Sequence, residues 1–168
     1  MAEKLFIDPS IMTEQTILGG NVDVDSYAFC IADTQVSIIE PLLGTLLYDK
    51  MITDLTFPVT YTGLYATLYT DFIVPITKHA ATANYIEIAG VQLNNGGIYK
   101  HQADSAQLLS NEDTYTLSGK WRAHSQMYVL RFNKWILNNT ITEYQTIQDD
   151  VDASTTLDNS AGWFFGED

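Results

Sequence analysis

The stretch "LYATLYTDFIVPITKHAATANYIEIA", residues 64–89, decides the fold class. Its apolar residues recur at every fourth position: Leu64, Leu68, Phe72, Ile76 and Ala80. Because an α-helix has 3.6 residues per turn, residues four apart lie near one face of it. The stretch therefore predicts a long helix with one buried face. Pro75 lacks an amide hydrogen and clashes with the carbonyl four residues back, so we expect a break or bend there.

This helix is expected to run on through Leu93 and to end at residues 94–97, "NNGG", because asparagine and glycine commonly end helices. Small residues in its second half would let another helix approach closely: Ala80, Ala81, Ala83, Ala89 and Gly90. The segment from Ile98 to Leu109 is polar with scattered apolar residues. We expect it to link this helix to the next one.

Two further helical segments are predicted upstream. Asp8-Pro9 is a typical helix start, and Gly19-Gly20 is a typical stop. A second helix is expected to begin at Asp23. Its apolar face would consist of Val24, Tyr27, Ala28, Ile31 and Ile38. Pro41, within "EPLLGTLLYDKM" (residues 40–51), predicts a kink or two abutting helices.

A capping-box pattern at Ser110 and Asp113 predicts the start of the last helix, which is expected to end near Asn138. One stripe of it holds Leu117, Trp121, Ser125, Tyr128, Phe132 and Ile136. Together the patterns predict an all-α protein, a bundle of four to five helices with proline kinks. The bundle would cover residues 1–141, and an extended C-terminal arm, residues 142–168, would follow it.

The chain is strongly acidic, with 21 Asp and Glu against 8 Lys and Arg and a net charge of −13. Such a surface repels phosphate, so it disfavours wrapping around nucleic acid or lying on an anionic membrane. The N-terminus lacks the basic region and the apolar run of a signal peptide, and no stretch has the length of a membrane span. We therefore expect a protein that is made in a cytoplasm, stays soluble and does not contact membranes.

Sequence templates for catalysis, cofactor binding and metal binding are missing, so we expect no enzyme, no cofactor and no metal. The residues 21–27, "NVDVDSY", only faintly resemble a calcium loop, because the glycine and the bidentate glutamate of that loop are missing. The lone Cys30 is expected to be a buried structural thiol. His79 and His124 are expected to be half-buried beside aromatic residues, and His101 lies far from both in the sequence.

Half of the basic residues lie on the last predicted helix: Lys120, Arg122, Arg131 and Lys134. Helical spacing places Lys120, Arg131 and Lys134 along roughly one side of it. From Asn138 onward the chain has seven acidic residues and no Lys or Arg. One interpretation is two separate solvated surfaces, since isolated ion pairs contribute little. The other is that the acidic arm of one copy contacts the basic side of a neighbour.

The chain ends in "NSAGWFFGED" (residues 159–168), which places Trp163, Phe164 and Phe165 next to one another after Gly162. Fully extended, the arm spans up to roughly 90 Å, well beyond the diameter of a small domain. The aromatic residues would therefore either fold back onto their own domain or fill a pocket on another molecule.

Three segments together carry a family resemblance: the kinked helices at residues 27–51, the four-residue apolar repeat at 68–89 and the C-terminal sequence at 159–168. They resemble the head–tail connector proteins of tailed bacteriophages, and most closely the small adaptor, or ring, proteins from the neck of crAss-like phages. The "EPLLGTLLYDKM" segment is similar to the helix–proline–Leu-Leu-Gly element of that group. The likeness extends from Met1 to about Asn138 and again over the extreme C-terminus.

The resemblance implies a structural connector (adaptor) that forms a ring, commonly of twelve copies, under the portal at the phage neck. It joins capsid to tail, and DNA passes its lumen without specific binding. The implied partners are further copies, the portal protein and other neck or tail proteins. The implied location is the head–tail junction of the virion, reached from the host cytoplasm during assembly. Some acidic residues would face the DNA channel, and the candidates are Asp25, Asp33, Asp49 and Asp54.

Within this picture the arm, residues 142–168, would dock on the portal or a neighbouring ring through Gly162, Trp163, Phe164 and Phe165. Lys120, Arg131 and Lys134 would make the lateral contact between copies. Two other function classes stay open. One is an acidic inhibitor or DNA mimic that binds a basic host protein, which would need acids spaced like phosphates on one face. The other is an enzyme of unrecognised type, which would need a deep polar pocket.

Overall fold

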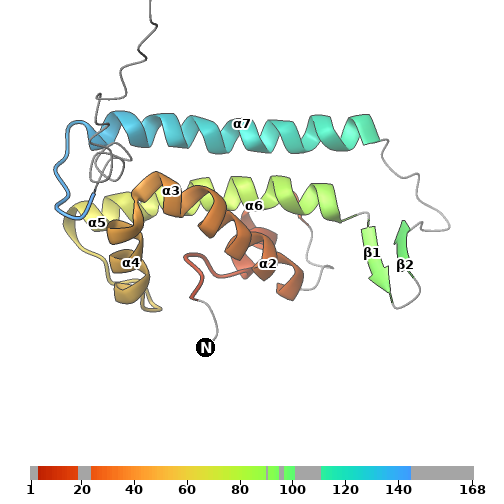
Figure 1. Ribbon diagram of the computed structural model, residues 1–168, viewed down its shortest axis with the longest axis horizontal. Coiled ribbons are helices and arrows are strands. Elements are labelled where there is room, and N and C mark those ends of the chain that lie inside the picture. Colours follow the sequence, from red (N-terminus) through yellow and green to blue (C-terminus); the bar gives the residue numbers. More distant parts are fainter. Residues whose placement is uncertain (1–3, 19–23, 90, 95–96, 101–110, 145–168) are drawn as a thin grey trace, which may run out of the picture.

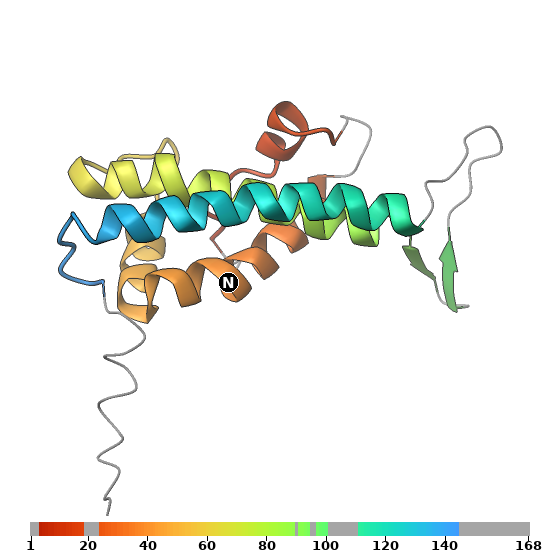
Figure 2. The same cartoon turned by 90° about the horizontal axis from the view of Figure 1, so that it is seen from above.

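The computed structural model describes residues 4–18, 24–89, 91–94, 97–100 and 111–144. Its two longest helical segments run antiparallel and side by side, and shorter helices lie along both flanks of this pair (Figures 1 and 2). α1 (Ser10–Gln15, red) lies on one flank. On the other flank lie α2 (Val24–Thr34), α3 (Glu40–Leu43) and α4 (Thr45–Asp54). The predicted all-α bundle of four to five helices is confirmed.

The central helix is continuous from Gly63 to Ile88, although its winding changes on the way. It consists of α5 (Gly63–Leu68), the π-helical turn η2 (Tyr69–Ile73) and α6 (Val74–Ile88). The Val74 amide donates to the carbonyl of Tyr69, five residues back. This wider turn gives Pro75 room in the first turn of α6, because the proline ring clashes with a tightly wound preceding turn. The predicted break is therefore absent, and the helix adapts through a π-helical turn.

The same arrangement recurs at Pro41. The π-helical turn η1 (Gln35–Ile39) follows α2, and the Glu40 amide donates to the carbonyl of Gln35. α3 then ends at Gly44, whose φ of 75° is a conformation that glycine adopts without strain. α4 begins at the next residue. The prediction of abutting helices after Pro41 is confirmed.

The helix predicted to run through Leu93 ends at Ile88 instead, and this prediction was wrong. β1 (Val91–Asn94) and β2 (Gly97–Lys100) form an antiparallel hairpin, with Val91 opposite Lys100 and Asn94 opposite Gly97. The sequence between the strands, Asn95-Gly96, is the dipeptide typical of tight hairpin loops. This turn preference, together with a β-branched residue on each strand (Val91 and Ile98), outweighs the helical pattern.

The first helix is also shorter than the predicted stop at Gly19-Gly20 implies, since it ends at Gln15. Its start at Asp8-Pro9 is confirmed, because a carboxylate oxygen of Asp8 accepts from the Ser10 amide at 2.8 Å. At the other end Thr16 adopts an extended conformation, and its hydroxyl accepts from the Leu18 amide at 3.1 Å. Threonine competes with helix hydrogen bonding in this way, which explains the early stop.

Two clusters of buried side chains hold the helices together. The larger one joins α4, the central helix and α7 (Asn111–Ile136), and it includes Phe6 and Ile141 from outside the helices. The smaller one joins α1, α2 and Ala81 of α6. Val74 packs against both clusters. The predicted stripe of α7 is confirmed, with Phe132 fully buried at its centre. The central helix therefore contributes side chains to both clusters.

Candidate interaction surfaces

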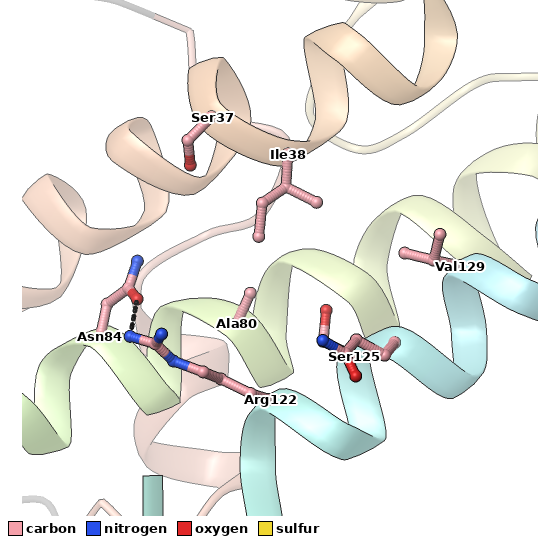
Figure 3. Close-up of a pocket in the computed structure, with 8 residues that line it drawn as sticks. Ser37, Ile38, Ala80, Asn84, Arg122, Ser125 and Val129 are labelled. Carbon is pink, nitrogen blue, oxygen red and sulfur yellow. Dashed lines mark hydrogen bonds between the residues drawn. The ribbon is translucent and has the colours of Figure 1, made fainter. Parts of the chain in front are cut away.

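A groove of about 320 Å³ lies between η1, α6 and α7 (Figure 3). Its apolar lining comes mainly from Ile38, Ala80 and Val129. A chain of polar contacts runs along one end of it. Arg122 Nη2 lies 2.8 Å from Glu87 Oε2 and 3.5 Å from the amide oxygen of Asn84. The Asn84 amide nitrogen in turn lies 3.3 Å from Asp33.

These polar side chains satisfy one another across helix boundaries. Ser118 also donates to Glu87, at 2.8 Å, so both carboxylate oxygens of Glu87 accept a hydrogen bond. The groove therefore contains a structural network that ties α2 to α6 and α7. Arg122, one of the four basic residues of the last helix, is half exposed and is held in this network by Glu87 and Asn84.

The side of α7 that faces away from α6 is uncovered in the part of the chain that the structure describes (Figure 1). The three predicted lateral-contact residues, Lys120, Arg131 and Lys134, are all exposed there. The Arg131 guanidinium lies 5.2 Å from the centre of the Tyr128 ring. No described residue forms an ion pair with Lys120 or Lys134. The structure therefore brings the three basic residues onto one open helix face.

Apolar side chains on the same face were not predicted. Met127 and Leu130 are 59% and 61% exposed, and Leu137, directly after the helix, is 85% exposed. Their spacing of three and seven residues is visible in the sequence, but it resembles that of the buried stripe. An exposed group of large apolar residues with basic neighbours is typical of an interaction surface.

His79 lies in a cluster of rings between α6 and α7. Its ring centre is 5.3 Å from that of Trp121, 5.5 Å from that of His124 and 5.6 Å from that of Tyr128. The expectation of a half-buried imidazole beside aromatic residues is confirmed for His79, whereas His124 is exposed. Burial, assisted by the charge of Lys78 and by His124, lowers the pKa of His79 to about 4. The buried Nδ1 atom has no hydrogen-bond partner among the described residues.

We expect His79 to make folding stability depend on pH. Between about pH 4 and pH 6.5 the unfolded chain binds a proton at His79 and the folded chain does not, so stability falls as the pH falls. The free energy of unfolding should therefore be lower at pH 4 than at pH 7, and His79→Phe should reduce this difference by about 1–2 kcal/mol. One pKa unit corresponds to about 1.4 kcal/mol, and partial solvation reduces the effect. Urea unfolding at both pH values measures the difference. His124→Phe serves as the control, and an equal pH response in both variants would contradict the assignment.

The remaining candidate residues lie apart from one another. Cys30 is buried, as expected, and burial together with Asp33 raises the pKa of its thiol to about 11. Of the four acids considered for a channel wall, Asp33, Asp49 and Asp54 are exposed on α2 and α4. Asp54 forms an ion pair with Lys50 at 3.0 Å. Within the described ranges no three His, Cys, Asp or Glu side chains come together as a metal site. His101 and the side chain of Asp25 lie outside them.

The first residues of the predicted arm lie against the bundle. The Tyr65 hydroxyl donates to Glu143 at 2.6 Å, which lowers the pKa of this carboxyl, and Lys50 lies 4.0 Å from it. The Tyr144 ring meets that of Phe132 edge to face at 5.8 Å. Gly162, Trp163, Phe164 and Phe165 lie outside the described residues. The contact with Tyr65 places Glu143 at the α5 end of the central helix.

A family model described as a family of unknown function (DUF6712) matches residues 39–153, which is more than half of the chain. The chain belongs to this family. The match starts at the end of η1 and includes α3 to α7 and the hairpin, while α1 and α2 precede it. No curated protein and no solved structure matches the chain. None of the described helices combines the length and the apolar character that crossing a membrane requires.

Proposed function

We propose that this protein is a structural connector subunit that assembles with copies of itself into a ring under a phage portal. In this function the helical bundle forms the wall of the ring, and DNA passes through its lumen. The C-terminal arm docks on the portal or a neighbouring ring. The protein is part of the virion at the head–tail junction, and it acts through contacts with other chains, without catalysis.

The observation that carries the proposal is the open face of α7, on which exposed apolar and basic residues lie together. Apolar side chains such as Met127 and Leu130, 59% and 61% exposed, favour burial against another surface. A net charge of −13 makes copies repel one another, so contact between them needs local cations. Lys120, Arg131 and Lys134 supply such cations. The resemblance of residues 27–51, 68–89 and 159–168 to phage neck proteins supports the same assignment.

The attachment of Glu143 and Tyr144 to the bundle supports a docking role for the residues that follow. The contacts of these two residues, with Tyr65 and Phe132, fix the point from which the arm starts. A fixed starting point raises the effective concentration of the arm's end near a neighbouring ring. Trp163, Phe164 and Phe165 supply large apolar rings, the residue types that contribute most at protein interfaces.

Deletion of Gly162–Asp168 tests the docking role. We expect helical circular dichroism and melting temperature to stay as in the full chain, because the bundle holds its own core. Binding to the portal protein encoded with this chain should weaken more than tenfold, since the aromatic residues are lost. Surface plasmon resonance on immobilised portal rings measures the binding.

Deletion of Glu167 and Asp168 alone provides the matched control, because it shortens the chain but keeps the aromatic residues. This control should bind the portal as the full chain does. Unchanged portal binding after the longer deletion would contradict the docking role. A collapse of the fold would show that the aromatic residues belong to the chain's own core, which would also contradict it.

A further inference from the structure

Two exposed helix stripes on this chain have the same spacing and opposite charge. The α7 stripe consists of Leu130 and Lys134 on α7 and Leu137 directly after it, and the α2 stripe consists of Phe29 and Asp33 on α2 and Val36 on the adjoining η1. Each has an apolar residue, a charged residue four positions later and a second apolar residue three positions after that. Residues at such spacings lie on one side of a helix. Each stripe is therefore a short apolar surface with one charge at its middle.

All six side chains are open to solvent. The apolar residues of the α7 stripe, Leu130 and Leu137, are 61% and 85% exposed. Those of the α2 stripe, Phe29 and Val36, are 67% and 53% exposed. Asp33 and Lys134 are exposed as well. The contacts within the described chain therefore leave the four apolar residues uncovered, and Asp33, which accepts a hydrogen bond from Asn84 of α6, still has its side chain exposed.

The two stripes cannot cover each other within one chain. α2 lies on one flank of the central helix, whereas the open side of α7 faces away from that helix (Figures 1 and 2). Residues on the groove side of α7, such as Arg122, are the ones that face α2 and η1. Each copy thus presents both an acidic and a basic apolar stripe, on separate parts of its surface.

We propose that the α2 stripe of one copy packs on the α7 stripe of the next copy, with Asp33 paired to Lys134. Phe29 and Val36 would then pack against Leu130 and Leu137, because the apolar residues are seven positions apart in both stripes. The match in spacing lets both apolar contacts and the ion pair form at once. No described residue forms an ion pair with Lys134, and the described polar partner of Asp33 is the neutral Asn84.

This contact joins two different surfaces, so it is heterologous. A heterologous contact leaves one free stripe at each end of a growing assembly, and repetition closes into a ring where the rotation allows it. The inference rests on the proposed function, since it names the surfaces by which the copies of the ring meet. It adds that the acidic partner of the basic α7 face lies on α2.

Charge reversal tests the pairing in the full chain at low ionic strength, by sedimentation velocity over a concentration series. Asp33→Lys and Lys134→Glu should each raise the dissociation constant of self-association at least tenfold, because like charges would then face each other. The combined variant Asp33→Lys/Lys134→Glu should return it to within about threefold of the unmodified chain. In the combined variant the positive charge lies at position 33 and the negative charge at position 134, so the ion pair can form again.

The Asp33→Lys variant is informative because it makes the chain less acidic. Overall repulsion between copies falls, so any effect of net charge alone would strengthen association. Asp71→Lys is the matched control, since Asp71 is an exposed acid on η2, outside both stripes. This control should associate at least as well as the unmodified chain.

Three outcomes would overturn the pairing. Asp33→Lys could behave like Asp71→Lys, or the combined variant could associate more weakly than either single variant. In both cases self-association itself would persist and the ring proposal would stand. An unmodified chain that stays monomeric over the whole concentration range would overturn the pairing and the ring proposal together.

Discussion

Phe132→Ala is expected to lower the free energy of unfolding by about 3–5 kcal/mol, the range for removing a buried aromatic ring. Phe132 is fully buried on α7, and its ring contacts those of Phe72, Trp135 and Tyr144 at centre distances of 5.8 to 6.4 Å. Its loss leaves a cavity where α7, the central helix and the start of the arm meet. Urea unfolding monitored by circular dichroism measures the change.

Phe29→Ala is the matched control, because the Phe29 side chain is 67% exposed on a helix. At a concentration low enough to keep the chain monomeric, this variant should stay within about 0.5 kcal/mol of the unmodified protein. Similar losses in the two variants would contradict the arrangement of α7 described above. The same measurement on Phe132→Leu should give a smaller loss, since leucine fills part of the cavity.

Gln35→Leu is expected to cost about 2–3 kcal/mol, because Gln35 is a fully buried polar residue with two partners on the N-terminal segment. Its side-chain oxygen accepts from the Phe6 amide at 2.5 Å, and its side-chain nitrogen donates to the Lys4 carbonyl at 3.2 Å. Leucine has a similar volume but leaves both backbone groups without their partner. An unpaired buried group costs about 1–3 kcal/mol.

The readout for Gln35→Leu is again the urea midpoint, combined with amide hydrogen exchange at Phe6. Exchange at this amide should accelerate, since its acceptor is gone. Gln126→Leu, at an exposed position of α7, controls for the change from glutamine to leucine. A Gln35→Leu variant as stable as this control, with a protected Phe6 amide, would contradict the role assigned to Gln35.

Much of the fold is predictable from the sequence because burial leaves a periodic pattern. Leu68, Phe72, Ile76 and Ala80 recur every four residues, and all four are buried in the central helix. The α7 stripe is predictable for the same reason. The hairpin is not, since four-residue strands are too short to show a period of two beside a long helical pattern.

The candidate interaction surfaces are only partly predictable. Lys120, Arg131 and Lys134 stand out because charged residues are rarely buried, so their position on an outer face follows from their type. The exposure of Leu130 and Leu137 cannot be predicted in this way, since leucine is common both in cores and on surfaces, and only packing shows which side of α7 is covered. The structural role of Gln35 cannot be predicted either, because its partners are backbone groups about 30 positions away in the sequence.

The π-helical turn at Tyr69–Ile73 also explains how a strict four-residue repeat can serve a helix. In regular α-helical winding each residue advances by about 100°, so a row of residues four apart drifts sideways by about 40° at every repeat. Over the length of this segment the row would turn away from the core. A π-helical turn contains more residues than an α-helical turn, so each residue advances by a smaller angle and the row turns back toward the core. The unusual winding thus keeps one straight apolar seam facing α7 and α4, where a uniform pitch would spread the same residues around the cylinder.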